Sequence, residues 1–355
     1  MSSADPTFDA LGGWRGVLGE LTASRDITAE QARVAMAEIL SGEASPAQIA
    51  AFIVALHMKG ETVDEVGGMV DAMLAAAAPI ELPGGADPVD IVGTGGAPSR
   101  RAHALNVSTM ACFVVAGAGG SVLKHGNRKA SSTSGSFDLL EALGVNAEVD
   151  GAEVTRCFVE AGIAFCFARA FHPAMRFAGP VRADLGVPTV FNFLGPLSHP
   201  ARVRRMVIGV SDPVLAPVVI GTLQLRHVTR AMVVYGHDGT DELVTTGPST
   251  VFELADGDVR RSEIRPADFG LAEVSVEAVA GGDAETNAEI AGRVFSGEKG
   301  PYRDIVALNA AAGLWAGGGV DSIADGLERA FASIDTGGAA DALERLRVVS
   351  NVLPG

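Results

Sequence analysis

The chain has 355 residues, of which 48% are hydrophobic and 20% are charged, a balance typical of a globular enzyme. This length predicts one large domain and one smaller domain. The formal net charge of −16 disfavours binding to nucleic acid or to an anionic membrane. Basic residues still gather locally at Arg100–Arg101, Lys124–Lys129 and Arg202–Arg205, an arrangement that suits a small polyanion better than a DNA backbone.

The N-terminus and the cysteines predict a cytoplasmic protein. The sequence MSSADPTFDA lacks the basic region and apolar core of a signal peptide, and no run of about eighteen apolar residues is present to span a bilayer. Cys112, Cys157 and Cys166 form no CxxC pair. We therefore expect three buried free thiols in a reducing compartment.

Residues 1–82 are predicted to form a small helical domain. The pairs Thr28–Gln31 and Thr62–Glu65 have the spacing of capping boxes. Between them, Ser45–Pro46 combines a capping residue with proline at the first helical position. The apolar run Ala50–Met58 is richer than one helix face needs, which predicts that this domain packs against a partner subunit.

Residues 83–355 are predicted to form an α/β domain with a mostly parallel central sheet, because β-branched runs alternate with helical segments. In such a sheet the ligand loops lie at the carboxyl ends of the strands. A hairpin is expected at 249–261, turning on Asp256-Gly257. The predicted strands are 89–93, 121–126, 163–168, 205–210 and 231–236, and the predicted helices are 108–119, 137–145, 154–162, 217–227, 284–297 and 304–318.

A glycine turn follows the first predicted strand, in the sequence GTGGAPSRRAHALNVST (93–109). Glycines let backbone N–H groups approach an anion closely, and Ser108 and Thr109 lie near a helix start whose dipole favours negative charge. No Lys-Ser or Lys-Thr follows the glycines, which excludes an NTP-binding P-loop. Taken alone, GTGG is equally consistent with a plain turn between a strand and a helix.

The segment KHGNRKASSTSGS (124–136) follows the next predicted strand. Its cations, amide and hydroxyls among small residues favour a phosphate cage over a solvated polar loop. His125 could be a metal ligand, but the sequence has no second histidine at ligand spacing, so we interpret it as a polar wall. The cage residues are Lys124, His125, Asn127, Arg128, Ser131 and Ser132.

Two further polar groups are candidates for ligand contacts. Asp241 and Glu242 follow the strand 231–236; adjacent acids on a loop are usually solvated, but at this sheet edge they could bind a hard cation such as Mg²⁺. Arg176 and Arg182 lie in FHPAMRFAGPVRADLG (171–186), and either one could bind a substrate carboxylate or simply face solvent.

In this order, the motifs resemble those of the anthranilate phosphoribosyltransferase family of tryptophan biosynthesis, over nearly the full length of the chain. The motifs are GTGG…NVST, KHGNR, HPAMR, FNFLGPL and GHDGTDE. The resemblance implies a nucleoside-phosphorylase-like α/β domain, a homodimer formed through the helical domain, and a segment near 170–190 that packs back onto the helices. It also implies that the phosphoribosyl group of phosphoribosyl diphosphate (PRPP) is transferred to the amine of anthranilate, with Mg²⁺ as cofactor.

The resemblance also implies which residues bind each ligand. Lys124 and Arg128 would stabilise the charge of the leaving diphosphate, and no general base is expected because the nucleophile is a neutral aryl amine. The implied PRPP residues are Gly93, Thr94, Gly95, Gly96, Asn106, Val107, Ser108, Thr109, Lys124, His125, Gly126, Asn127, Arg128, Ser131, Ser132 and Ser136. The implied anthranilate contacts are Gly93, Asn127 and Arg182, with Arg182 facing the carboxylate, and the implied Mg²⁺ ligands are Ser108, Asp241 and Glu242.

The PRPP loop departs from the family pattern. Ala97 stands where the family usually has aspartate, nine residues separate GTGG from NVST where six are usual, and Ala104 replaces a small polar residue. A lost hydrogen bond to a charged group costs about 1.5–3 kcal/mol, so PRPP binding or turnover should weaken by roughly ten- to a hundredfold. Alternatively, Ser99 or Arg100 fills the gap.

Three other functions share this fold. The first is the same PRPP chemistry on a different aromatic amine, including an impaired paralogue. The second is a pyrimidine nucleoside phosphorylase, which KHGNR and the acidic pair argue against. The third is a non-catalytic nucleic-acid-binding protein, which the net charge of −16 disfavours.

Overall fold

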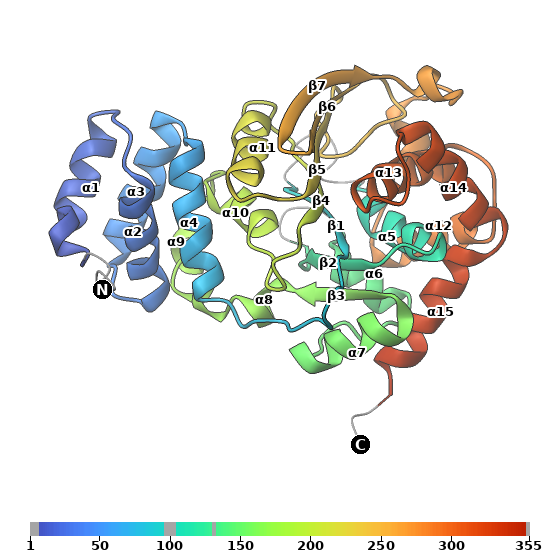
Figure 1. Cartoon of the computed structure of the whole chain (residues 1–355), viewed down its shortest axis with the longest axis horizontal. Coiled ribbons are helices and arrows are strands. Elements are labelled where there is room, and N and C mark those ends of the chain that lie inside the picture. Colours follow the sequence, from blue (N-terminus) through green and yellow to red (C-terminus); the bar gives the residue numbers. More distant parts are fainter. Residues whose placement is uncertain (1–6, 96–103, 130–132, 353–355) are drawn as a thin grey trace.

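The computed structural model describes residues 7–95, 104–129 and 133–352, in which a small helical unit lies beside a larger α/β unit (Figure 1). The helices of the small unit are α1 (Gly13–Thr22), α2 (Ala29–Ser41), α3 (Pro46–Lys59) and α4 (Val63–Ala75). Helices α2 and α4 pack closely against each other, and α1 packs against α3.

Side-chain caps start three of these helices, as the sequence predicts. Thr28 Oγ1 accepts from Gln31 N at 3.1 Å, Ser45 Oγ from Gln48 N at 3.3 Å, and Thr62 Oγ1 from Glu65 N at 3.3 Å. Glu65 is fully buried, and its carboxylate also accepts from Ile27 N at 3.0 Å and from Lys59 Nζ at 2.9 Å. These partners make burial of the charge tolerable and join the start of α4 to the end of α3.

A seven-stranded sheet forms the centre of the α/β unit, in the order β3-β2-β1-β4-β5-β6-β7. The neighbours from β3 to β5 are parallel, while β6 and β7 add an antiparallel hairpin. Asp256 and Gly257 form the hairpin turn, with φ of 54° and 84°, which confirms the predicted turn. The strands are β1 (Val89–Gly93), β2 (Val122–Gly126), β3 (Ile163–Phe167), β4 (Arg205–Gly209), β5 (Arg230–Gly236), β6 (Ser249–Ala255) and β7 (Asp258–Ile264).

Helices cover both faces of this sheet (Figure 1). Helices α5 and α13 pack on one face, and α11 packs on the other, where it also contacts α4. Helices α14 and α15 extend the helical layer beyond the two closing helices that the sequence predicts. The helices are α5 (Val107–Gly117), α6 (Ser136–Ala142), α7 (Gly151–Ala161), α8 (Ala168–Phe171), α9 (Gly179–Leu185), α10 (Phe191–Leu197), α11 (Leu215–Leu225), α12 (Ala284–Phe295), α13 (Pro301–Ala316), α14 (Ile323–Asp335) and α15 (Gly338–Ser350).

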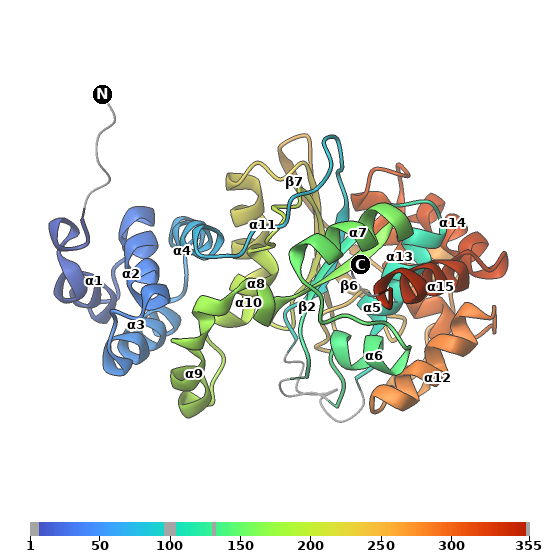
Figure 2. The same ribbon diagram turned by 90° about the horizontal axis from the view of Figure 1, so that it is seen from below.

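The segment after β3 leaves the sheet and returns to the helical unit (Figure 2). Helix α9 packs against α3, and the 3₁₀ turn Pro173–Arg176 packs against α2. A Cβ on Gly42, at the end of α2, would lie only 2.7 Å from the ring of Phe177. None of the helices within 7–95, 104–129 and 133–352 combines the length and apolar composition that a bilayer crossing requires.

The order of the strands sets the position of the ligand loops. The chain runs outward from β1 through β2 to β3 and then returns to place β4 on the other side of β1. The loops after β1 and β4 therefore leave the sheet in opposite directions, which opens a crevice at the carboxyl ends of these strands. The GTGG turn begins at this crevice, at Gly93.

The contact between α2 and α4 depends on Gly68. A Cβ at this position would lie 2.0 Å from the carbonyl oxygen of Ala29, so Gly68→Ala should lower the free energy of unfolding by at least about 1–3 kcal/mol in urea titrations. Gly19→Ala is the matched control, because this exposed glycine of α1 has no atom within 4 Å of the added Cβ. It should stabilise by roughly 0.5–1 kcal/mol, and equal effects of the two substitutions would refute the packing argument.

Candidate active site

A cleft of about 450 Å³ opens at the carboxyl ends of the parallel strands and brings together most of the residues that the sequence singles out. The loops after β1, β2 and β5 contribute to its wall, as does the segment from α8 to α10. The predicted residues that line it are Gly93, Thr94, Gly95, Asn106, Ser108, Lys124, His125, Gly126, Asn127, Arg128, Ser136, Arg182, Asp241 and Glu242.

Two of the predicted PRPP residues have buried side chains at the start of α5. Val107 and Thr109 are both 0% exposed, so they could contact a ligand only through their backbone N–H groups. Gly96, Ser131 and Ser132 lie outside the described residues, as do Ala97, Ser99 and Arg100.

The acidic pair lies against the ends of two central strands. Asp241 Oδ2 accepts from Gly95 N at 2.7 Å, which joins the loop after β5 to the glycine turn after β1. A Cβ on Gly93 would lie 2.1 Å from the same oxygen, and a Cβ on Gly209 would lie 1.7 Å from the carbonyl oxygen of Asp241. Glycine is therefore required at the ends of both β1 and β4 for the acidic loop to approach this closely.

Asn309 of α13 fixes the residue after the acidic pair. Leu243 N donates to Asn309 Oδ1 at 3.1 Å, and Asn309 Nδ2 donates back to Leu243 O at 2.8 Å. The side chain of Asn309 is 3% exposed. It pairs with both the N–H and the carbonyl group of Leu243, as the backbone of a neighbouring β-strand would. Asn309 was not predicted from the sequence. The available signal was a single amide within the apolar run DIVALNAAAGLW, since a buried amide needs partners.

Lys124 and Asp90 are buried near each other at the floor of the cleft. Lys124 is 1% exposed, and its ammonium donates to Ile91 O at 2.5 Å. Burial raises the pKa of Asp90 to about 7, although the positive charge of Lys124 and a hydrogen bond from His125 N oppose this shift. Lys124 therefore contributes positive charge at the floor of the cleft from a position fixed by the sheet.

Three histidine rings lie side by side at the end of β2, and two of them, those of His125 and His172, line the cleft. The ring of His125 is 5.3 Å from that of His172 and 5.5 Å from that of His199. Burial lowers the pKa of all three, and it lowers that of His199 to about 3. Ala201 N donates to Nδ1 of His199 at 3.1 Å, so the proton is on Nε2, which donates to Leu123 O at 3.0 Å. The three histidines are therefore neutral polar groups. In the described part of the chain, no three His, Cys, Asp or Glu side chains are grouped so that they could hold a metal ion.

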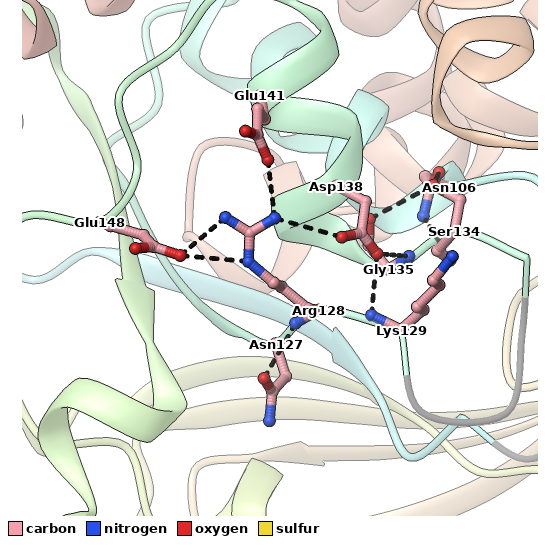
Figure 3. A network of polar contacts seen from close by, with 9 residues as sticks. All are labelled: Asn106, Asn127, Arg128, Lys129, Ser134, Gly135, Asp138, Glu141 and Glu148. Atoms are coloured by element: carbon pink, nitrogen blue, oxygen red, sulfur yellow. Dashed lines mark hydrogen bonds and ion pairs between the residues drawn. The ribbon is translucent and has the colours of Figure 1, made fainter.

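Arg128 is bound by carboxylates of its own chain (Figure 3). Its guanidinium donates to Glu141 at 2.7 Å, to Glu148 at 2.7 Å and to Asp138 at 3.4 Å. These hydrogen bonds raise the pKa of Arg128 and compensate much of its charge. Arg128 lines the cleft, but to bind a phosphate it would have to exchange one of these carboxylates for the ligand.

Asp138 joins the two ends of the loop after β2, at Lys129 and Gly135. Its Oδ2 accepts from Lys129 N and from Gly135 N, both at 2.8 Å (Figure 3). The two ends of the loop are thereby held by one carboxylate in the first turn of α6. This residue was also missed from the sequence, where it appeared only as part of a predicted helix.

The two candidate arginines have different surroundings. Arg182 lines the cleft and stacks on Phe191, with its guanidinium carbon 5.3 Å from the ring centroid; burial lowers its pKa. Arg176 is exposed, stacks on Phe177 at 4.4 Å and donates to Pro173 O at 3.4 Å. Of the two, Arg182 is the one placed to meet a ligand in this cleft.

Comparison with known proteins assigns the family. Residues 85–340 match the model of the glycosyl transferase family, a/b domain, and residues 15–77 match that of its helical bundle domain. The anthranilate phosphoribosyltransferase of Rhodococcus jostii is 52% identical over 338 residues, covering 94% of this chain and 92% of its own. The chain belongs to the anthranilate phosphoribosyltransferase family.

Solved structures of anthranilate phosphoribosyltransferases share the whole fold. The enzyme of Thermus thermophilus has a TM-score of 0.88 and 40% identity, covering 95% of this chain and 99% of its own. The enzyme of Saccharomyces cerevisiae is 27% identical and covers 96% of this chain and 98% of its own. It has been solved with PRPP and Mg, at a TM-score of 0.86, and with 4-fluoroanthranilate, at a TM-score of 0.85.

The buried histidines predict how stability depends on pH. The folded protein keeps His199 neutral down to about pH 3, whereas the unfolded chain takes up a proton below about 6.5, so this residue reduces stability as the pH falls through that interval. In urea titrations between about pH 6 and about pH 4, His199→Gln should lose about 1 kcal/mol less stability per pH unit than the wild type. The raised pKa of Asp90 has the opposite effect, because protonation of this buried carboxyl adds to stability as the pH falls. This contribution is present in both the wild type and His199→Gln, so it cancels when their stabilities are compared.

The control for this measurement is His227→Asn, which removes an exposed histidine at a left-handed backbone position that asparagine tolerates. Parallel stability curves for the wild type and His199→Gln would contradict the assignment of a neutral buried imidazole.

Proposed function

We propose that this cleft transfers the phosphoribosyl group of PRPP to the amine of anthranilate, giving N-(5-phosphoribosyl)anthranilate and diphosphate in tryptophan biosynthesis. The amine nitrogen forms a bond to C1 of the ribose, the bond from C1 to the diphosphate oxygen breaks, and the amine releases a proton to solvent. The observation that carries the proposal is the meeting of the glycine turn, the KHGNR loop and the acidic pair in one cleft. Family membership supports the same reaction.

PRPP would bind across the loops after β1 and β2. Backbone N–H groups at the start of α5 provide donors for phosphate oxygens, whereas Thr94 N and Gly95 N at the glycine turn already donate to Gly209 O and Asp241. Lys124 adds positive charge from the floor, and Asn106, Ser108 and Ser136 add polar side chains at the wall. Because these groups are held by the sheet and by α5, they need little reorganisation when charge develops on the leaving diphosphate.

The oxygen ligands available at the acidic pair are suited to Mg²⁺. Ser108, Asp241 and Glu242 line the same cleft and offer oxygen atoms, which this hard cation prefers. Among the described residues no third carboxylate or histidine joins this pair, which suits an ion that completes its coordination with water and substrate phosphate. When bound, Mg²⁺ supplies charge that stabilises the departing diphosphate.

Anthranilate would bind at the opposite wall. Arg182 presents a planar guanidinium, whose paired donors match a carboxylate, and Asn127 and Gly93 lie on the facing loops. Held in this way, the amine is presented to C1 of the ribose, and positioning supplies much of the rate. The neutral histidines need not act as bases, since the aryl amine attacks in its unprotonated form.

We also propose that residues 1–82 form a homodimer interface and that the enzyme is cytoplasmic. Met58 of α3 is 82% exposed, and it ends an apolar run whose members Val54 and Ala55 are only partly buried. An apolar surface of this kind is typical of a subunit contact. The three cysteines are unpaired and buried, which suits a reducing compartment.

The reaction can be followed by the loss of anthranilate fluorescence in the presence of PRPP and Mg²⁺. We expect a metal-dependent loss that EDTA abolishes. Asp241→Asn should lower kcat/KM by roughly a hundredfold or more, because it removes a charged oxygen ligand. Asp256→Asn makes the same chemical change at the β6–β7 turn, where asparagine tolerates the left-handed backbone, and should leave activity unchanged.

Fluorescence that stays constant while PRPP still binds would point to a different amine acceptor. Turnover that persists in excess EDTA would contradict the role given to the acidic pair.

Arg182→Lys tests the acceptor site. Lysine keeps the charge but loses the planar pair of donors, so KM for anthranilate should rise about tenfold while KM for PRPP stays constant. Arg176→Lys is the matched control, because this exposed arginine lies on the same segment. A larger effect of Arg176→Lys than of Arg182→Lys would overturn the assignment.

A further inference from the structure

A buried asparagine from the C-terminal part of the chain contacts the end of the PRPP loop. Asn287 lies in the first turn of α12 and is 0% exposed. Its Nδ2 donates to Ala104 O at 2.9 Å and to Asn106 Oδ1 at 2.8 Å. These two acceptors lie immediately before α5, where the loop after β1 ends. A side chain 181 residues further along the chain thus sets the position of Asn106.

The same hydrogen-bond chain reaches the loop after β2. Ser134 Oγ donates to Asn106 Oδ1 at 2.9 Å, and Asn106 Nδ2 donates to Ser134 O at 3.3 Å (Figure 3). The Oδ1 atom of Asn106 therefore accepts from Asn287 and from Ser134 together. Thr133 Oγ1 adds a second link, because it donates to Gly282 O at 2.7 Å. The loops after β1 and β2 meet at this point, against the segment that precedes α12.

Backbone contacts hold Asn287 in place. Gly282 N donates to Asn287 Oδ1 at 2.9 Å. Both the oxygen and the nitrogen of the Asn287 amide therefore have hydrogen-bond partners. A Cβ on Gly281 would lie 2.5 Å from Ala104 O and 2.6 Å from Leu105 Cα. Glycine at 281 therefore allows the two backbones to touch. The segment before α12 and the end of the PRPP loop form one packed unit.

Only an amide satisfies this arrangement. Asn287 faces acceptors with its Nδ2 and a donor with its Oδ1. Aspartate has the same shape but would place an oxygen against Ala104 O and Asn106 Oδ1. In a buried site, such unpaired acceptors repel one another, so the loop would have to move.

We propose that Asn287 is a positioning residue for PRPP, which holds the loops after β1 and β2 at the separation that the substrate requires. This inference rests on the proposed function, because it assigns PRPP to the same loops. Asn287 acts through Asn106 and Ser134, both of which line the cleft. Phosphate sites depend on preorganised donors, and small displacements of such donors weaken binding strongly.

The test compares the Michaelis constants of the two substrates in Asn287→Asp. We expect KM for PRPP to rise by about tenfold or more, while KM for anthranilate changes by less than about twofold. Isothermal titration of PRPP with Mg²⁺ should show the same loss of affinity. Ser333→Ala is the control, because Ser333 is 4% exposed and donates to Val114 O at 2.8 Å, away from both loops. It should lower the melting temperature and leave both Michaelis constants unchanged.

Gly281→Ala gives an independent test without changing a polar group. The added methyl would push against Ala104 and Leu105, so it should also raise KM for PRPP selectively. If Asn287→Asp does not fold, Gly281→Ala decides the question by the same measurements.

A wild-type KM for PRPP in Asn287→Asp, or equal rises in both Michaelis constants, would overturn the proposal. If the wild-type protein binds PRPP but does not use anthranilate, the proposed function fails separately, and the titration still compares the PRPP affinity of the variant with that of the wild type. Unchanged affinity in that titration would overturn the role of Asn287.

Discussion

The close approach of the acidic loop to the ends of β1 and β4 is the contact on which the cleft depends. Gly93 and Gly209 are neighbours in the sheet, and neither position has room for a Cβ beside Asp241. Because these strands are adjacent at the point where the chain order reverses, the loops after β1 and β5 meet across the crevice. The hydrogen bond from Gly95 N to Asp241 then joins the phosphate loop to the proposed metal ligands. Metal and PRPP would therefore share one rigid support.

Two buried asparagine side chains, Asn309 and Asn287, hold the loops of the cleft in position. Asn309 of α13 holds the backbone of Leu243, next to the acidic pair, and Asn287 of α12 holds Asn106 at the end of the PRPP loop. Both helices belong to the C-terminal part of the chain, and none of the described residues that line the cleft comes from either of them. In both cases one buried amide uses its donor and its acceptor. Asn309 pairs with both backbone groups of Leu243, whereas Asn287 donates to Ala104 O and Asn106 and accepts from Gly282 N of its own segment. The C-terminal helices thus give the cleft its shape without lining it.

Local signals in the sequence predicted much of the fold, whereas contacts between distant residues could not be predicted. Capping residues such as Thr28 act within one turn, and the turn at Asp256-Gly257 depends on two residues, so each can be read directly. The loops of the cleft could be placed because parallel strands end at one edge. Asn287 and Asp138 were missed because their partners are brought to them only by tertiary packing. Val107 and Thr109 lie in a binding motif, but burial beneath the helix start leaves only their backbone for contact.

The charges of the cleft suggest why a metal and a polyanion should bind together. The charge of Arg128 is compensated by Glu141 and Glu148, whereas Lys124 and Arg182 leave positive charge at the wall of the cleft. The protein as a whole carries a net charge of −16, and within the cleft Asp241 and Glu242 would repel the diphosphate of PRPP. Asp241 and Glu242 would hold a divalent cation, whose charge would remove this repulsion. Each ligand should then strengthen binding of the other, since the carboxylates that repel the diphosphate alone are the groups that bind the cation.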